Sequence, residues 1–366
     1  MKILHIITNL QTGGAEKLMV DLLPRVKDME YEVDLLLFDG THSPFYEMLK
    51  ENGVSIHVLG HIHNVYHPLY LFRLTRFLCR HQYDIVHTHN TAPQLFAAIC
   101  SIFCSVVLVT TEHSTSNRRR NWTWYRPIDC WMYQRYARII CISDAAEKNL
   151  REYLGVNYGA KICTIYNGVD VQRFASAKPA ADLIASKNKK AIVMVARFTY
   201  QKDQDTLIRA MAFLSKDEWE VWLVGEGERK EALKQLAVME GVANNVRFLG
   251  VRMDIPSVLK AADVIVMSSH FEGLSLSNIE GMSAGKPFLA SDVDGLREVT
   301  TGAGILFPHE DAKALANHIQ HLGNSPTLSI EVAAKCKERA LQYDIRTMAQ
   351  NYCEVYKALM VRTGLR

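Results

Sequence analysis

The chain has 366 residues, and at about 150 residues per domain this length predicts two domains. Apolar residues make up 48% of the chain and charged residues 22%, which excludes a disordered or low-complexity protein. Forty-two Lys and Arg against 39 Asp and Glu leave a net charge of +3. That charge is too small to predict a polyanion-binding surface, so any basic site must be local.

The eight cysteines form neither a C-x-x-C motif nor a Cys/His cluster at zinc spacing. We interpret them as small apolar core residues in a reducing compartment. The first residues, MKILHIITNL, lack the cleavage site of a secretory signal and predict a buried strand. The uncharged stretch from Asn90 to Thr111 is long enough to span a bilayer. Its halves favour a buried helix and then a strand, which argues against a span.

Apolar segments of strand length alternate with helical patterns, which predicts β-α-β units and parallel sheets. The expected strands in the first half are 3–7, 33–38, 55–59, 85–87, 106–110 and 139–142, and those in the second half are 191–195, 220–224, 246–249, 264–267, 287–290 and 305–307. Residues 169–190 show no clear periodicity and predict a connecting segment. The sequence therefore predicts two doubly wound α/β domains, whose ligands bind where the carboxyl ends of the strands meet.

Residues 268–287 follow an expected strand and read SSHFEGLSLSNIEGMSAGKP. The apolar spacing predicts a helix after residues 273–275, and a helix N-terminus offers unpaired N–H groups and a positive dipole end to a phosphate. Glu280 could accept hydrogen bonds from a ribose, and Glu272 from a sugar. A nucleotide sugar matches these three features, while an ordinary strand–loop–helix with solvated glutamates is the alternative.

Arg197 and Lys202 follow the first strand of the second half, in VMVARFTYQKD. A forked guanidinium and a compact ammonium on one loop could bind a diphosphate. Because negative charge grows on a leaving diphosphate, such cations stabilise the transition state more than the ground state. We therefore predict that both are catalytic. An ordinary surface pair is the alternative.

Two features of the first half could extend this site. Gly13 and Gly14 follow the first strand, where glycine lets the backbone approach a ligand closely, although the segment is neither a G-x-G-x-x-G nor a P-loop. His113 follows the strand 106–110 and could bind a sugar hydroxyl or assist at the anomeric centre; a structural role is the alternative. The other histidines lack a carboxylate or cysteine at ligand spacing, so we expect no metal.

The segment 118–126, RRRNWTWYR, interleaves arginines with aromatic rings. Such rings seat at a membrane interface while guanidinium groups meet phosphates. The segment therefore predicts peripheral contact with an anionic membrane or a lipid diphosphate through Arg118, Arg119, Arg120, Trp122 and Trp124. A solvated loop is the alternative. We expect no nucleic acid partner, because the near-neutral chain gives no electrostatic support.

Taken together, the motifs resemble the retaining glycosyltransferases of group 1 (family 4), which have the GT-B fold. The resemblance rests on the GGAE at 13–16, the EHS around His113, the NGVD at 167–170, the Arg197/Lys202 pair and the E-x7-E of Glu272 and Glu280. It covers almost the whole chain. It implies an N-terminal acceptor-binding Rossmann-like domain (1–168), a nucleotide-sugar-binding Rossmann-like domain (169–343) and a C-terminal segment (344–366) whose helix, at 344–359, crosses back to the first domain.

The resemblance also implies residue roles. Glu272 contacts donor-sugar hydroxyls, Glu280 binds ribose, and the cations clamp the diphosphate. His113 lies near the donor sugar. The remaining donor-binding positions are Gly13, Gly14, Gly273, Leu274, Ser275 and Leu276. No cofactor or metal is implied.

The implied enzyme is a cytoplasmic hexosyltransferase, peripheral on the inner membrane face where it contacts lipid. It moves a sugar with retention from a UDP-linked donor to a surface-polysaccharide or lipid-linked acceptor. Ala196 and Asn278 depart from the family pattern, where glycine and an apolar residue are commoner, and they leave the sugar open. The alternatives are a nucleotide-sugar isomerase of the same fold, such as a non-hydrolysing 2-epimerase, and a non-catalytic nucleotide-sugar-binding protein.

Overall fold

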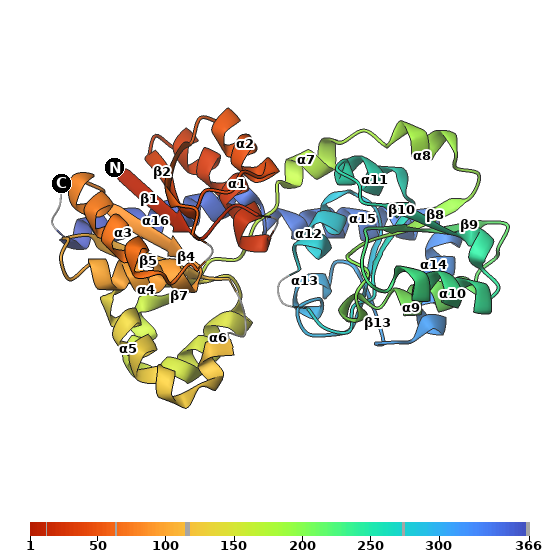
Figure 1. Cartoon of the computed structure of the whole chain (residues 1–366). Coiled ribbons are helices and arrows are strands. Elements are labelled where there is room, and N and C mark those ends of the chain that lie inside the picture. Colours follow the sequence, from red (N-terminus) through yellow and green to blue (C-terminus); the bar gives the residue numbers. More distant parts are fainter. Residues whose placement is uncertain (12, 63, 114–117, 273–274, 364–366) are drawn as a thin grey trace. The chain divides into compact units, whose positions relative to one another are not determined.

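The structure is a computed structural model of the chain, and it describes residues 1–11, 13–62, 64–113, 118–272 and 275–363 (Figure 1). The chain divides into two compact units. Unit 1 comprises Met1–Asn167 and Ile345–Arg366, and unit 2 comprises Gly168–Asp344. Each boundary differs by one residue from the boundary expected from the sequence.

Unit 1 contains a seven-stranded sheet in the order β3-β2-β1-β4-β5-β6-β7, and every pair is parallel. Its strands are β1 (Lys2–Ile7), β2 (Glu32–Asp39), β3 (Ser55–Gly60), β4 (Ile85–His89), β5 (Val107–Glu112), β6 (Arg138–Cys141) and β7 (Ile162–Thr164). The sequence predicted six of them and missed β7, because three residues are too few to form a recognisable apolar run.

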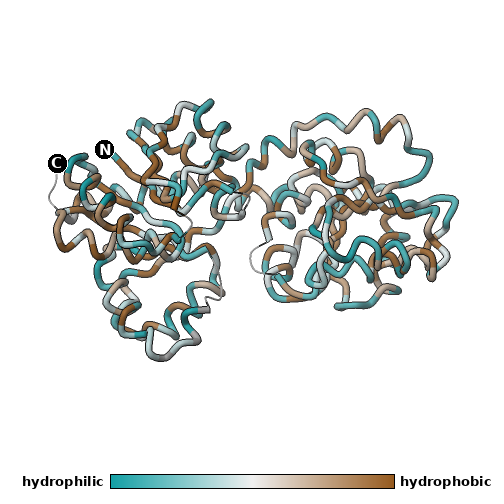
Figure 2. Tube along the Cα trace, viewed as in Figure 1, coloured by the Kyte–Doolittle hydropathy of each residue, from teal (hydrophilic) through white to brown (hydrophobic). Residues whose placement is uncertain are grey.

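Helices cover both faces of this sheet. Alternate residues of β1 show the division, because Ile3 and Ile7 belong to one core cluster and Leu4 and Ile6 to the other. The first cluster includes residues of α1 (Gly14–Asp28), α2 (Pro44–Glu51) and α16 (Ile345–Thr363). The second includes residues of α3 (Pro68–Arg80), α4 (Thr91–Cys100), α5 (Arg126–Arg135) and α6 (Asp144–Leu154). The tube in Figure 2 is accordingly most hydrophobic along the inner strands.

The C-terminal helix returns to the first domain, as expected. Helix α16 packs against α1, and its Tyr352 and Tyr356 are fully buried. The short 3-10 turns of this unit are η1 (Arg118–Asn121), η2 (Thr123–Tyr125) and η3 (Val156–Lys161). The uncharged stretch 90–111 forms α4 and most of β5. Among the described residues, no helix has both the length and the apolar character that crossing a membrane requires.

Unit 2 contains a six-stranded parallel sheet in the order β10-β9-β8-β11-β12-β13. Its strands are β8 (Lys190–Val195), β9 (Trp219–Val224), β10 (Val246–Gly250), β11 (Val264–Met267), β12 (Phe288–Ser291) and β13 (Ile305–Phe307). The sequence predicted all six within about one residue at each end, because both faces of a parallel strand are buried and the apolar runs are nearly continuous.

The helical elements of unit 2 are α7 (Val171–Ser176), α8 (Ala181–Ala185), η4 (Tyr200–Lys202), α9 (Gln204–Met211), α10 (Lys230–Met239), η5 (Ala243–Asn245), α11 (Ile255–Ala261), α12 (Leu276–Ser283), α13 (Arg297–Thr300), α14 (Ala312–Asn324) and α15 (Pro326–Leu341). The segment 169–190, expected to be irregular, carries α7 and α8. Both are too short for helical periodicity to be visible in the sequence. Asp170 caps α7 by accepting a hydrogen bond from the Arg173 amide at 3.0 Å.

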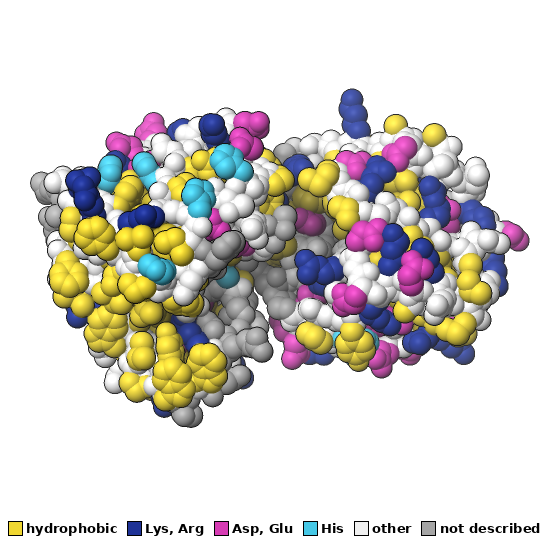
Figure 3. Space-filling model, in the orientation of Figure 1, with side chains coloured by type: hydrophobic (Ala, Val, Ile, Leu, Met, Phe, Trp, Pro, Cys, Tyr) yellow, Lys and Arg dark blue, Asp and Glu magenta, His cyan; other side chains and the backbone are white. Residues whose placement is uncertain are grey.

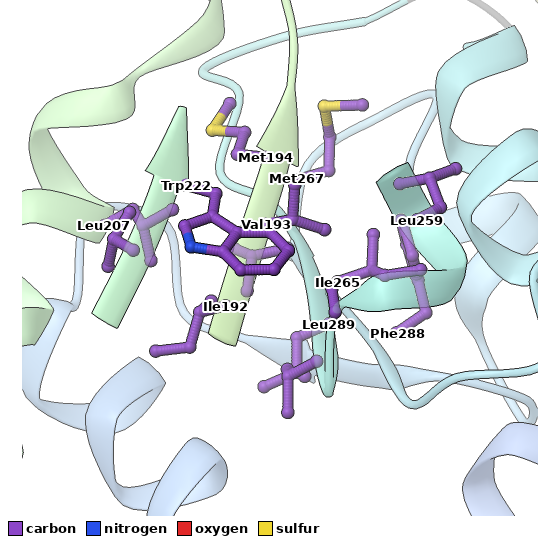
Figure 4. Close-up of a cluster of buried hydrophobic side chains, with 14 of the residues drawn as sticks. Ile192, Val193, Met194, Leu207, Trp222, Leu259, Ile265, Met267, Phe288 and Leu289 are labelled. Carbon is purple, nitrogen blue, oxygen red and sulfur yellow. The ribbon is translucent and has the colours of Figure 1, made fainter. Parts of the chain in front are cut away.

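One core cluster holds unit 2 together. Trp222 of β9 is fully buried at its centre, and Figure 4 shows it beside Ile192 and Val193 of β8 and Leu207 of α9. The indole N–H donates to Glu220 at 2.7 Å, so its one polar atom is satisfied. Packing of this kind fixes the central strands and therefore the loops that follow them.

Both sheets have a point where the strand order reverses, between β1 and β4 in unit 1 and between β8 and β11 in unit 2. In open α/β sheets, ligands bind beyond the carboxyl ends of the strands at this point. Arg197 and Lys202 follow β8, and Glu272 follows β11. Gly13 and Gly14 follow β1. The sequence-predicted residues therefore lie at or next to the reversal point of each sheet.

Helix α12 packs closely on the sheet at Gly281, which makes this glycine a test of the fold. An added Cβ would lie 2.6 Å from the Phe288 ring and 3.1 Å from Ile265 Cγ2. Overpacking costs about 1–3 kcal/mol and helix propensity returns only about 1 kcal/mol, so we expect Gly281→Ala to lower the melting temperature. The matched control is Gly14→Ala, because a Cβ there meets no atom within 4 Å. Equal melting temperatures for the two variants would contradict this packing.

Candidate functional site

An ion pair at the carboxyl ends of β8 and β11 brings two predicted residues together. The Lys202 ammonium donates to Glu272 Oε1, across 70 residues of sequence. The side chain of Glu272 is 7% exposed and that of Lys202 is 19% exposed. An ammonium has three N–H donors, so Lys202 can bind an anion while it holds this carboxylate.

Hydrogen bonds from both loops fix the position of Glu272. Ser269 Oγ donates to Glu272 Oε1 at 2.7 Å, and Gln201 Nε2 lies 3.5 Å from Oε2. Gln201 also accepts from the His270 amide at 2.8 Å and donates to the Phe271 carbonyl at 3.0 Å. Among the described residues Oε1 is therefore engaged twice, while Oε2 makes one long contact and can accept from a hydroxyl.

A strained residue ends the β8 loop. Asp203 directly follows Lys202 with φ at +48°, a conformation that side chains rarely adopt. Its carboxylate accepts from the Thr206 hydroxyl at 2.6 Å and the Thr206 amide at 3.2 Å, which caps α9. Its carbonyl accepts from Ser268 Oγ at 2.6 Å. These bonds tie the residue after the ammonium both to the next helix and to the β11 loop.

Arg197 lies at the start of the same loop and is exposed. Its guanidinium makes no hydrogen bond or ion pair with any residue that the structure describes. Its backbone is packed closely, because a Cβ on Gly225 (φ +138°) would lie 2.1 Å from the Ala196 carbonyl oxygen, and one on Gly227 would lie 2.3 Å from that of Phe198. The end of β9 therefore has to carry glycine beside the Arg197 backbone.

The E-x7-E helix begins where the sequence predicted. Ser275 occupies the N-cap of α12 and is 7% exposed, and the helix has no acidic residue in its first turn. Leu276 is the first helical residue, and Glu280 is half-buried within the helix. The predicted donor-binding residues Gly273 and Leu274 lie outside the described part of the chain.

Asn278, one of the two departures from the family pattern, lies inside unit 2. It is fully buried, and its amide donates to Thr300 Oγ1 at 3.3 Å. Asn278 therefore joins α12 to α13. The sequence could not show this, because residue 278 lies one position before the apolar Ile279, and either neighbour could face the core.

The structure places Gly13 and Gly14 at the start of α1. Gly13 is the N-cap with extended backbone and its carbonyl accepts from the Lys17 amide at 2.9 Å. Gly14 is exposed, with open space where a Cβ would be. A helix of 15 residues begins here, and the first N–H groups of a helix have no partner within it.

His113 directly follows β5 and is held by another histidine. Its Nε2 lies 2.8 Å from His89 Nδ1. Burial lowers the pKa of His113 to about 4, although the neighbouring Glu112 carboxylate acts in the opposite direction. The ring is therefore neutral at physiological pH and can exchange hydrogen bonds with a hydroxyl.

Glu112 forms a buried charge cluster with Arg119, Arg120 and Asp129, which we call the Glu112 cluster. Arg120 donates to Glu112 at 2.7 Å, and Arg119 donates to Asp129 at 3.2 Å. All four side chains are at most 6% exposed. Burial acts to raise the pKa of Glu112, but the two guanidinium groups and hydrogen bonds from Tyr133 and Gln94 outweigh it and lower the pKa below its ordinary value.

The cluster corrects the expected membrane contact. Arg119 and Arg120 do not face solvent, so their guanidinium groups cannot meet lipid phosphates. The side chain of Arg118 lies outside what the structure describes. The rings of Trp122 and Trp124 are exposed and stack with their centroids 5.9 Å apart. Figure 3 shows further hydrophobic side chains on the surface of unit 1. Membrane contact through Trp122 and Trp124 stays a prediction.

Two groups of described residues have ligand atoms close enough to hold a metal ion. One is His5, His87 and His89, and the other is Asp203, His270 and His309. In the first group His5 Nδ1 lies 3.0 Å from His89 Nε2, and the two nitrogens of His87 are engaged by Tyr356 and Thr111. In the second group, Asp203 is engaged by Thr206.

The site contains residues that the sequence analysis did not identify. Ser269, Gln201 and His89 contact predicted residues but belong to no recognised motif. The signal that the sequence offered was the residue type at two turns. Asn and Asp tolerate a positive φ at turns, and both Asn90 and Asp203 adopt one. His89 could not have been placed beside His113 without knowing the register of β4 and β5.

Two family models match the chain. Residues 12–173 match the family described as Glycosyltransferase Family 4, and residues 178–343 match Glycosyl transferases group 1. Together the two matches span almost the whole chain. The protein is a group 1 glycosyltransferase. It has the GT-B fold, with two parallel Rossmann-like sheets, and residues of both units fall within the matched regions.

Relatives of this glycosyltransferase include two bacterial proteins. The Escherichia coli UDP-Gal:alpha-D-GlcNAc-diphosphoundecaprenol alpha-1,3-galactosyltransferase is 27% identical over 74% of this chain and 73% of its own. The Rhizobium meliloti lipopolysaccharide core biosynthesis glycosyltransferase LpsD is 26% identical over 91% of both chains. The structure of Anabaena HepE in complex with UDP superposes with a TM-score of 0.83 at 22% identity, covering 98% of this chain and 100% of HepE, and supports the fold.

The Glu112 cluster should be required for the stability of this glycosyltransferase. Glu112→Gln leaves the buried Arg120 guanidinium without its counterion, and loss of one partner of a buried ion pair costs about 3–5 kcal/mol. The pKa of Glu112 is lower in the folded than in the unfolded chain, so its stabilisation is complete above about pH 4.5 and is lost as the pH falls through the folded value. Urea unfolding at pH 7 measures the loss.

The matched control is Glu331→Gln, which removes an exposed ion pair with Lys335 in α15. Its unfolding midpoint should stay close to that of the wild type. A Glu112→Gln midpoint equal to that of the control would show that the cluster does not stabilise unit 1.

Proposed function

We propose that the protein is a retaining hexosyltransferase that uses a UDP-linked sugar and extends a surface-polysaccharide or lipid-linked saccharide. The observation that carries this proposal is the ion pair of Lys202 and Glu272 at the reversal point of the unit 2 sheet. It presents a cation for the diphosphate beside a carboxylate for the sugar. The UDP complex of HepE and the UDP-galactose named for the E. coli relative support the choice of nucleotide.

In this proposal unit 2 binds the donor. The N-terminus of α12 receives a phosphate, Glu280 accepts from the ribose hydroxyls, and Glu272 accepts from a sugar hydroxyl through Oε2. Arg197 and Lys202 bind the diphosphate oxygens. Arg197 is exposed and makes no bond with a described residue, so its fork is available to an anion.

In this proposal unit 1 binds the acceptor. The open space at Gly14 admits a phosphate to the start of α1, and His113 binds a sugar hydroxyl. The exposed pair of Trp122 and Trp124 suits an acceptor presented at a lipid surface, because indole rings seat at such an interface. The diphosphoundecaprenol named for the E. coli relative is an acceptor of this kind.

The chemistry follows from the charges. The bond between the anomeric carbon and the β-phosphate oxygen breaks, and negative charge grows on the diphosphate. Lys202 and Arg197 stabilise that charge. The acceptor oxygen forms its bond to the anomeric carbon on the same face, and its proton passes to the departing phosphate oxygen, so configuration is retained. The protein supplies position and positive charge.

Substitution of the ion pair tests the proposal. Glu272→Gln and Lys202→Ala should each lower the rate of UDP release from UDP-sugars by about 100-fold or more, because each removes a charged contact to the transition state. Their melting temperatures should remain near that of the wild type, because the pair lies at the edge of the core. Turnover is measured by coupled detection of UDP.

The matched control is Lys234→Ala, which removes a lysine from the exposed pair with Glu231 in α10 of the same unit. Its turnover should equal that of the wild type. Near-normal rates in Glu272→Gln or Lys202→Ala would remove that residue from the mechanism. Conversion to an epimeric sugar without UDP release would favour an isomerase, and binding of the nucleotide sugar without turnover would favour a non-catalytic protein.

A further inference from the structure

A row of four histidines crosses the unit 1 sheet beneath the C-terminal helix. His5 lies in β1, His87 and His89 lie in β4, and His113 directly follows β5. His5 pairs with His87 in the register of β1 and β4. The side chains share the sheet face that α16 covers, since Tyr356 of this helix reaches the rings of both His5 and His87.

Hydrogen bonds join His113 to Tyr356 through two of these rings. His113 Nε2 lies 2.8 Å from His89 Nδ1, and His89 Nε2 lies 3.0 Å from His5 Nδ1. His5 Nε2 lies 3.5 Å from the Tyr356 hydroxyl, whose oxygen is also 2.6 Å from His87 Nδ1. We call His5, His89 and His113 the histidine chain. It ends at the helix that follows unit 2 in the sequence.

Each ring of the histidine chain carries one proton. Burial lowers the pKa of His5 to about 3 and that of His113 to about 4, and it holds the pKa of His89 well below its ordinary value. A neutral imidazole has one N–H donor and one acceptor nitrogen. Every bond in the chain therefore has a direction, and the direction of one bond determines the direction of all the others.

The Tyr356 hydroxyl sets this direction. A hydroxyl forms shorter hydrogen bonds than a ring N–H does, so the 2.6 Å contact indicates that Tyr356 donates to His87 Nδ1. Its oxygen then accepts from His5 Nε2. His5 Nδ1 accepts from His89 Nε2, and His89 Nδ1 in turn accepts from His113 Nε2. His87 keeps its proton on Nε2, which lies 2.8 Å from Thr111 Oγ1.

We propose that Tyr356 is a positioning residue that holds the proton of His113 on Nε2, through His5 and His89, and leaves Nδ1 to accept a hydrogen bond from a substrate hydroxyl. The part of this inference that concerns substrate rests on the proposed function, whereas the tautomer does not. An imidazole with a fixed tautomer meets a hydroxyl in one orientation only, which favours a sugar hydroxyl that donates.

The tautomer can be read directly by NMR on the full chain labelled with ¹⁵N-histidine. Long-range ¹H–¹⁵N correlations distinguish the protonated from the unprotonated ring nitrogen, and the His113→Gln variant assigns the resonance. The wild type should show His113 protonated on Nε2. In Tyr356→Phe the chain loses its fixed end, so His113 should show a mixture of the two tautomers.

The matched control is Tyr352→Phe, which removes a buried hydroxyl one turn away on α16. That hydroxyl lies 3.3 Å from Thr111 Oγ1, beyond His87 and off the path to His113. The His113 tautomer should remain unchanged in this variant. In a transfer assay Tyr356→Phe should lower kcat/KM by about tenfold, the worth of roughly one hydrogen bond, and Tyr352→Phe should change it little.

An Nδ1–H tautomer of His113 in the wild type would overturn the inference, and so would an unchanged tautomer in a folded Tyr356→Phe protein. The wild-type spectrum tests the predicted tautomer of His113 even where Tyr356→Phe fails to fold. A correct tautomer in a chain that releases no UDP from any UDP-sugar would contradict the proposed function and leave the positioning role intact.

Discussion

The ion pair between Lys202 and Glu272 fixes the relation between the two loops on which the donor site depends. The loops belong to neighbouring strands of one sheet, so the rigid core of unit 2 carries them, and the ammonium and carboxylate then orient each other. Ser269 and Gln201 add hydrogen bonds from either side. A cation and an acceptor are therefore held side by side before any ligand arrives, which reduces the reorganisation that catalysis requires.

Unit 1 supports the end of β5 in a different way. On one side of the sheet, the Glu112 carboxylate is held by Arg120 within a buried cluster. On the other side, the next residue, His113, is joined to the C-terminal helix through neutral imidazoles. Adjacent residues of one strand end are thus anchored by charge on one face and by directional hydrogen bonds on the other. Both anchors serve a position where a substrate hydroxyl is proposed to bind.

Much of the fold could be predicted from the sequence, because buried parallel strands are continuous apolar runs. Short elements give no recognisable pattern in the sequence. The strand β7 (Ile162–Thr164) was therefore missed, and the segment containing α7 and α8 was expected to be irregular. The motif residues Arg197, Lys202 and Glu272 were recognisable because each lies in the segment between a strand and the next helix. Their pairing was not, since a lysine assigned to phosphate and a glutamate assigned to sugar gave no sign of contact.

The direction in which side chains point was the main feature of the site that the sequence did not predict. Three consecutive arginines suggested an exposed surface, yet Arg119 and Arg120 turn inward because β5 ends in a buried carboxylate that needs counterions. The histidine chain was invisible for a similar reason: His5 and His89 are 84 residues apart and meet only through the register of two strands. Sequence spacing carries no information about such contacts.

The most direct test of the donor site is a calorimetric titration of the full chain with UDP, compared with the same titration of Lys202→Ala. The account predicts that UDP binds with one site per chain and that the variant binds roughly tenfold to a hundredfold more weakly, because a charge-assisted contact of about 1.5–3 kcal/mol is lost. Absence of UDP binding, or equal affinity in the two proteins, would contradict it.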